Sequence, residues 1–121
     1  MRDEIIFGKY EPRFYTGGIR RFENLNLEKL KKLVDLKFVD VEEYQNDSPT
    51  IREFIKFMEK YPDYTVMGYV VSIERSDYRV SLDGIEKIAP AESKAEENEF
   101  IELFRNADDF NINDEMYAWF D

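Results

Sequence analysis

The stretch from Tyr64 to Leu82 constrains most strongly what this chain can fold into. It is dominated by β-branched and aromatic residues, which favour strands, and Ser76-Asp77 favours a turn within it. We therefore predict a β-hairpin here. Because side chains alternate between the faces of a strand, one face of the first arm would carry Met67, Tyr69, Val71 and Ile73, and one face of the second arm Tyr78, Val80 and Leu82.

The register of this hairpin can be predicted from the requirement that the apolar residues of both arms lie on one buried face. A four-residue loop would set Ile73 opposite Val80 and would pair Glu74 with Arg79 on the other face. A loop with an odd number of residues would turn Val80 away from the apolar face of the first arm. We therefore predict the four-residue loop, from Arg75 to Tyr78.

Three segments show the apolar spacing of amphipathic helices, and each follows a residue suited to cap a helix N-terminus. The segments are 27–35 after Asn26, 49–61 after Ser48 with an alternative capping box at Thr50-x-x-Glu53, and 94–106 after Ser93 in Ser93-x-x-Glu96. Pro62 is expected to end the second helix, since the residue before a proline avoids the helical region.

The remaining segments give weaker patterns. Ile5 to Phe7 predicts a short strand, and Gly17-Gly18 predicts the turn of an edge hairpin or loop that sets Phe14 opposite Arg21 and Arg13 opposite Phe22. Residues 108–121 predict a second hairpin, in which Phe110 and Ile112 alternate with polar residues and Met116 to Phe120 forms the last strand.

These elements predict one compact α+β domain over residues 1–121. We expect an antiparallel sheet of about four strands with about three helices packed on one face. The alternative is a winged-helix arrangement, with Thr50 to Lys60 as the recognition helix and Tyr64 to Leu82 as the wing.

The composition excludes several classes of chemistry. The chain of 121 residues has no cysteine and no histidine, which excludes thiolate nucleophiles, Ser-His catalysis and the commonest zinc sites. It also lacks a glycine-rich phosphate loop and a Gly-x-Ser-x-Gly motif. We therefore predict no catalytic residues and no cofactor, with a carboxylate-based enzyme as an alternative. A membrane span and a secretory signal are not indicated, and we expect a cytoplasmic location.

One segment resembles a calcium loop in its first spacings. Asp109-x-Asn111-x-Asn113 fits an EF-hand start, but Asp114 stands where glycine is required and Phe120 where a bidentate acid is required. Phe110 also alternates with the polar residues as in a half-buried strand. We therefore predict no metal site.

Two basic patterns point only weakly to nucleic acid. Arg52, Lys56 and Lys60 form a row on the second helix, which is typical of its solvated side. Basic and aromatic residues also interleave near the N-terminus, at Lys9, Tyr10, Arg13, Phe14, Tyr15, Arg20, Arg21 and Phe22. Because the net charge is −10, binding to nucleic acid is not expected.

The charge is concentrated in the last quarter of the chain. Residues 92–121 hold ten acidic and two basic residues, a balance of −8 out of −10. Such a region either keeps the protein soluble or binds a protein partner, and its charge attracts basic partners. The candidate interaction residues are Glu96, Glu97, Glu99, Glu102, Asp108, Asp109, Tyr117 and Trp119.

We therefore predict a small, acidic, non-catalytic protein that acts through protein–protein contact. The alternative is an acidic mimic of nucleic acid that inhibits a basic nucleic-acid-binding protein. The two differ in their response to salt, because an electrostatic decoy complex weakens steeply as ionic strength rises. Whether the chain forms homo-oligomers stays open at this level.

Overall fold

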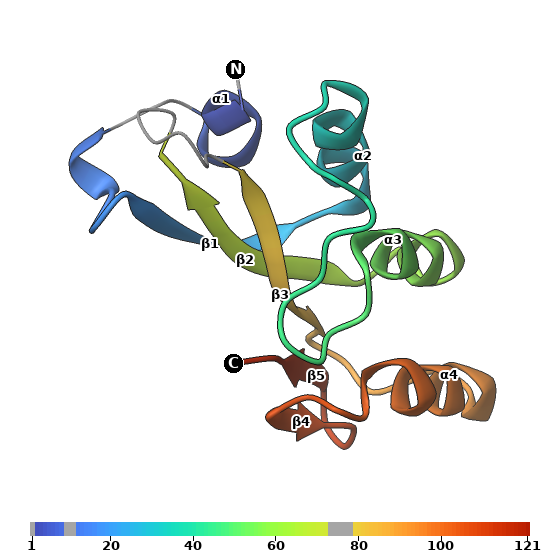
Figure 1. The fold of residues 1–121 in the computed structure, drawn as a ribbon. Coiled ribbons are helices and arrows are strands. Elements are labelled where there is room, and N and C mark those ends of the chain that lie inside the picture. Colours follow the sequence, from blue (N-terminus) through green and yellow to red (C-terminus); the bar gives the residue numbers. More distant parts are fainter. Residues whose placement is uncertain (1, 9–11, 73–78) are drawn as a thin grey trace.

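The computed structural model describes residues 2–8, 12–72 and 79–121, which form one α+β domain (Figure 1). The helices are α1 (Arg2–Phe7), α2 (Leu27–Asp35), α3 (Ile51–Lys60) and α4 (Lys94–Phe104), with a 3-10 helix, η1, at Pro12–Phe14. The strands are β1 (Ile19–Leu25), β2 (Thr65–Val71), β3 (Val80–Lys87), β4 (Asp109–Asn111) and β5 (Met116–Trp119). The predicted fold class is confirmed, and the described ranges hold one helix and one strand more than we predicted.

The five strands form one antiparallel sheet in the order β1-β2-β3-β5-β4. β3 lies at its centre, paired with β2 along most of its length and with β5 along its last part. Both predicted hairpin pairings are confirmed, β2 with β3 and β4 with β5. β1 lies at one edge of the sheet, beside β2.

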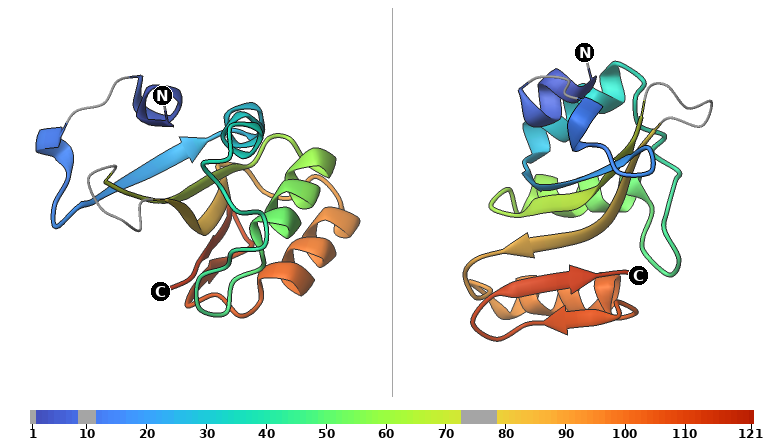
Figure 2. Two further views of the ribbon diagram at one scale, coloured as in Figure 1. Left: turned by 45° about the horizontal axis from the view of Figure 1, so that its top comes forward. Right: turned by 90° about the vertical axis from the view of Figure 1, so that its left-hand side faces the viewer.

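The sheet has an inner face, which packs against helices, and an outer face. Inner-face side chains in the hydrophobic core are Phe22, Leu25, Val66, Val70, Val80, Leu82, Ile85, Met116 and Ala118. Helices α2, α3 and α4 lie on the same side of the sheet (Figure 2) and contribute Leu30, Leu33, Ile51, Phe54, Phe57, Met58, Phe100 and Phe104. Burial of this aromatic-rich set is the main force that holds the helices on the sheet.

The register of β2 against β3 differs from our prediction. Val80 pairs with Val70 and not with Ile73. An odd number of residues therefore separates the two paired valines, whereas we predicted an even number between paired residues. Consequently Met67 and Val71 lie on the outer face, opposite to Val80, and Tyr69 lies there too. Ile73 and the predicted loop from Arg75 to Tyr78 lie outside the described residues.

The prediction failed because β2 is buried on both faces. Met67 and Val71 are as well buried on the outer face as Val66 and Val70 are on the inner one, so alternation does not mark the core side. A bulge at Asp83 further shifts the register, and glycine permits a close strand approach nearby. A Cβ atom on Gly68 would lie 1.9 Å from the Ser81 carbonyl oxygen.

The helix starts agree with the capping signals. Asn26 accepts a 2.9 Å hydrogen bond from the Lys29 backbone N–H, and Ser93 accepts one of 3.1 Å from Glu96 N–H. Thr50 and Glu53 form a reciprocal capping box at the start of α3, so the alternative start is the correct one and Pro49 precedes the helix. α4 ends at Phe104, close to the predicted end.

The N-terminal segment is a helix, and the strand predicted at Ile5 to Phe7 is wrong. α1 is held by a buried ion pair, because Arg2 and Asp3 are only 1% and 2% exposed and lie 2.8 Å apart. Arg2 also donates a hydrogen bond to the Val71 carbonyl, and the Tyr15 hydroxyl donates to Asp3. These contacts join distant parts of the chain, so local sequence patterns did not reveal them.

The turn at Gly17-Gly18 is confirmed, but the hairpin around it is short. Thr16 and Ile19 form an isolated bridge across two glycines with positive φ, 61° and 80°. Arg13 and Phe14 lie in η1 and do not pair with β1, which instead pairs with β2.

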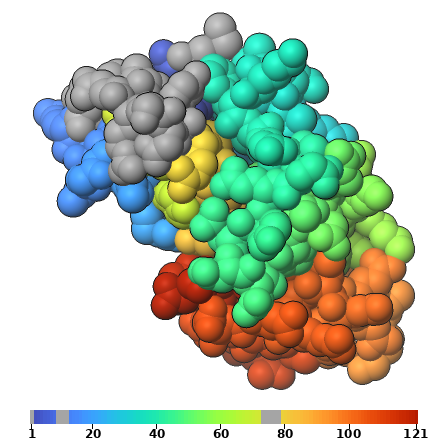
Figure 3. Space-filling model, viewed as in Figure 1, coloured from blue at the N-terminus to red at the C-terminus, as the bar shows by residue number. Residues whose placement is uncertain are grey.

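The winged-helix alternative does not describe this fold, because α3 buries its apolar side in the core beneath a five-stranded sheet. The connector between α2 and α3, residues 36–50, crosses the surface from α2 toward the C-terminal hairpin (Figure 3). Gln45 accepts a 3.1 Å hydrogen bond from the Tyr69 hydroxyl, and Glu43 accepts one of 2.6 Å from the Ser81 hydroxyl. The connector is therefore fixed to the β2–β3 part of the outer face.

Candidate functional site: the outer face of the sheet

The strand register brings acidic and aromatic side chains together on the outer face. Thr65, Glu86, Tyr117 and Asn111 form one row across four strands, because each pairs with the next. Met67, Gly84, Trp119 and Asp109 form the adjacent row. Residues in one row point to the same face, so sequence-distant side chains become neighbours.

Two aromatic side chains of β5, Tyr117 and Trp119, lie half-exposed in these rows. They are supported from β2 and β3, since Met67 lies over Gly84 beside Trp119. A Cβ atom on Gly84 would come within 2.8 Å of the Met67 side chain and 2.9 Å of the Ala118 carbonyl oxygen. The absence of a side chain at Gly84 therefore leaves room for the Met67 side chain in the row that also holds Trp119.

Carboxylates surround these aromatic rings. Partial burial and the nearby charges of Glu23 and Glu115 raise the pKa of Glu86. Partial burial, and then the charges of Asp109 and Glu86, raise the pKa of Tyr117. Burial is the larger cause of both pKa shifts, and the neighbouring carboxylates add to each of them. We call this set, Glu23, Glu86, Asp109, Glu115, Tyr117 and Trp119, the acidic–aromatic surface.

A bidentate ion pair borders the acidic–aromatic surface. Arg21 on β1 donates two hydrogen bonds, of 2.9 and 3.1 Å, to the carboxylate of Asp83 at the β3 bulge. Beside it is a small hollow of about 260 Å³ whose walls include Tyr69, Trp119 and Asp121. The hollow is large enough for one side chain, and its walls combine aromatic and acidic residues with Arg21 and two amide side chains.

The predicted interaction residues do not form one surface. Asp109, Tyr117 and Trp119 lie together on the outer face. The predicted residues of α4 lie instead on the helix-covered side of the sheet: Glu97 pairs with Lys94, Glu99 pairs with Lys60, and Glu102 is exposed. Asp108 is exposed next to β4, where its carboxylate accepts a 2.8 Å hydrogen bond from the Asp121 N–H.

Glu96 is buried, and its prediction as a surface residue is corrected by the structure. Its Oε2 atom lies 2.6 Å from Lys87 Nζ and accepts a 2.8 Å hydrogen bond from the Tyr64 hydroxyl. Its other oxygen accepts a 3.0 Å bond from the Glu92 N–H. Burial acts to raise the pKa of Glu96, but the hydrogen bonds from Lys87, Glu92 and Tyr64 outweigh it and lower that pKa. Glu96 thus fixes α4 to β3.

Sequence reasoning missed three acidic residues of the surface, Glu23, Glu86 and Glu115. Glu86 is separated from Tyr117 by a whole helix and hairpin, and the two become neighbours only because β3 pairs with β5. The sequence holds no clear signal for it, because Glu86 and Lys87 are both charged although Glu86 is partly exposed and Lys87 is buried.

The basic residues considered for nucleic acid are largely engaged within the molecule. Arg52 pairs with Glu42, Lys60 pairs with Glu99, and Arg20 stacks on the Phe7 ring with its guanidinium carbon 3.4 Å from the centroid. Lys9 and Tyr10 lie outside the described residues. These three residues are therefore partnered within the molecule.

In the described part of the chain, no group of three or more acidic residues is placed to hold a metal ion. Among those residues, no helix is long and apolar enough to cross a membrane. Comparison of the chain with family models, with curated proteins and with solved structures found no match.

Proposed function

We propose that this protein is a non-catalytic binding protein whose acidic–aromatic surface docks a basic segment of a partner protein, rich in arginine or lysine. The observation that carries the proposal is the placement of half-exposed Tyr117 and Trp119 in rows bordered by Glu86 and Asp109. Aromatic faces attract cations, and tyrosine and tryptophan are enriched at protein interfaces. The absence of cysteine is compatible with a cytoplasmic site of action.

Electrostatics favours a basic partner over a second copy of this chain. A second copy would bring a surface of the same negative sign and would increase the repulsion that already raises the pKa of Glu86. A cation next to Glu86 would instead relieve that repulsion. Docking of a basic segment would therefore convert an unfavourable interaction within the free protein into a favourable one with its partner.

Apolar contact at the binding surface distinguishes this proposed function from that of a nucleic-acid mimic. A mimic needs regularly spaced charges and little apolar contact, so its complex would be lost as salt rises. Contact with Tyr117 and Trp119 would retain part of the affinity at high salt. Titration of a labelled Arg/Lys-rich peptide at low and high salt distinguishes the two functions.

The decisive experiment compares two variants that lose the same charge. Glu86→Gln with Asp109→Asn removes two charges from the acidic–aromatic surface, and Glu97→Gln with Glu102→Gln removes two from α4. We expect the first pair to weaken peptide binding about tenfold, equivalent to about 1.4 kcal/mol, and the second to change it by less than about twofold. Equal weakening by both pairs would mean that net charge alone attracts the peptide, and lack of saturable binding would refute the proposal.

A further inference from the structure

We infer that a groove between α1 and α2 binds a small amphiphile with an anionic headgroup. This site is separate from the acidic–aromatic surface, and its lining includes two lysines, Lys29 and Lys32. It has a volume of about 800 Å³, within the usual range of small-molecule sites. The inference rests on its apolar lining, its two cationic side chains and the fixed position of its walls.

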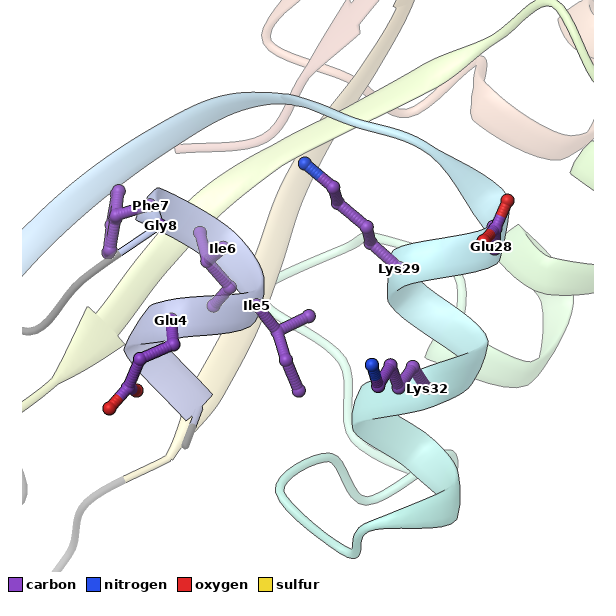
Figure 4. Close-up of a pocket in the computed structure, with 8 residues that line it drawn as sticks. All are labelled: Glu4, Ile5, Ile6, Phe7, Gly8, Glu28, Lys29 and Lys32. Carbon is purple, nitrogen blue, oxygen red and sulfur yellow. The ribbon is translucent and has the colours of Figure 1, made fainter.

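The groove has an apolar side formed by α1. Ile5 and Ile6 are half-buried, and both pack against the hydrophobic core while also lining the groove. Ile5 points from α1 into the space between the two helices (Figure 4). Gly8 follows with a positive φ of 88°, and its N–H donates a 3.0 Å hydrogen bond to the Glu4 carbonyl. This conformation ends α1, and with it the apolar side of the groove. The tail of an amphiphile would lie on these isoleucines.

The opposite wall, α2, supplies two cations. Lys29 and Lys32 are exposed, lie one turn apart, and project toward α1 (Figure 4). Neither side chain forms an ion pair or hydrogen bond within the described residues. Their neighbour Lys31 differs, since it pairs with Glu59 on α3 at 3.0 Å. Two uncompensated ammonium groups beside an apolar wall match an anionic headgroup.

The acidic residues of the groove do not oppose this assignment. Glu4 and Glu28 also belong to its lining, but both point away from the space between the helices (Figure 4). The ammonium groups are therefore the charges nearest to that space. In a chain with a net charge of −10, two lysines directed toward an apolar groove reduce the repulsion that an anion would meet there.

The wall formed by α1 is fixed before any ligand binds. The buried Arg2–Asp3 pair, with its bonds to the Val71 carbonyl and the Tyr15 hydroxyl, anchors the start of the helix to the sheet. A preformed wall lowers the entropic cost of binding. The wall is also short, because six helical residues span about 9 Å, less than the i to i+7 contact length of a docked amphipathic helix. The groove thus fits a small ligand better than a partner helix.

Three probes test the inference on the full chain, with all concentrations kept below micelle formation: decanoate, decyltrimethylammonium and acetate. Decanoate carries both the tail and the anionic head, whereas each of the others lacks one of these features. We expect saturable decanoate binding by calorimetry, with shifts of the Ile5 and Ile6 methyl resonances, and no such shifts with acetate. Decyltrimethylammonium should shift these methyls at least about tenfold more weakly.

A matched pair of variants locates the headgroup. Lys29→Gln with Lys32→Gln should weaken decanoate binding about tenfold, whereas Lys31→Gln should leave it unchanged. The inference is overturned if decanoate fails to saturate, if the Ile5 and Ile6 methyls do not respond, or if Lys31→Gln weakens binding as much. Because neither variant touches the acidic–aromatic surface, peptide binding should be retained in both.

Discussion

Lys87 of β3 and Glu96 of α4 form a 2.6 Å ion pair whose side chains are only 7% and 4% exposed. The Tyr64 hydroxyl completes the site, and the Lys87 ammonium lies 5.2 Å from the centroid of the Tyr64 ring. In the described residues no buried side-chain polar atom lacks a hydrogen-bond partner. Each of the two buried charges has lost its hydration, and only the presence of the other charge compensates for that loss.

We predict that Glu96→Gln destabilises the fold by about 3–5 kcal/mol, because it leaves the Lys87 charge buried without its carboxylate. Urea unfolding at neutral pH measures the change. The control is Glu97→Gln, whose partly exposed carboxylate pairs with Lys94, and its cost should stay below about 1 kcal/mol. Similar costs for both variants would show that the buried pair contributes no more than a surface pair.

The same residue predicts a pH dependence. Since the folded pKa of Glu96 lies below its unfolded value near 4.5, the pair stabilises the fold above that pH. This stabilisation is lost progressively as the pH falls below 4.5 and through the folded pKa. Thermal unfolding followed from neutral to acidic pH should show a smaller acid-induced loss in Glu96→Gln than in the parent. An unchanged acid profile would contradict the assignment.

Glu86 should behave in the opposite way. Its folded pKa is raised above the ordinary glutamate value of 4.5, chiefly by burial, so its ionisation opposes folding and stability decreases as the pH rises through that range. We predict that Glu86→Gln stabilises the protein at neutral pH by about 0.2–1 kcal/mol, and that the gain disappears below pH 4.5. Melting temperatures at the two pH values provide the measurement. A variant that is more stable yet binds a basic peptide less tightly would indicate that this charge is maintained for binding.

Gly84→Ala tests the support beneath the aromatic row. The added methyl would meet the Met67 side chain at 2.8 Å and the Ala118 carbonyl oxygen at 2.9 Å, so we predict a loss of about 1–3 kcal/mol. Adding Met67→Ala removes one of the two clashes. The double variant should therefore lose less than the sum of the two single losses in chemical unfolding, and strict additivity would contradict this packing arrangement.

Trp119 provides a direct signal for the proposed surface, since it is the single tryptophan of the chain. Docking of a basic segment should shield its half-exposed ring and reduce quenching by acrylamide. Decanoate, which we assign to the groove between α1 and α2, should leave the quenching unchanged. Shielding by decanoate but not by the peptide would reverse both assignments.

The three helices α2, α3 and α4 were predictable from the sequence because their signals are local, whereas α1 was not. Asn26, Thr50 and Ser93 each bond to a backbone N–H three residues ahead, so a short window contains the whole capping interaction. The existence of both hairpins was predictable for the same reason. The register was not, because the bulge at Asp83 and the burial of both faces of β2 depend on the assembled sheet.

The candidate site was partly predictable. The aromatic C-terminal strand pointed to Tyr117 and Trp119, and alternation in β4 placed Asp109 beside them. Composition could not separate Glu96, which is buried, from its exposed neighbour Glu97, since both lie in the first turn of α4. Nor could it find Glu86, whose place opposite Tyr117 requires the pairing of β3 with β5.

The central position of β3 has a consequence for folding cooperativity. Because one continuous strand pairs with β2 along one side and with β5 along the other, fraying of the C-terminal hairpin would leave β3 as an unpaired edge beside β2. Amide hydrogens of residues 84–87 should therefore exchange with solvent at rates close to those of global unfolding. Detachment of residues 88–121 would remove the β5 partner of β3 and the core side chains of α4, so the two ends of the sheet should form and break as one kinetic unit.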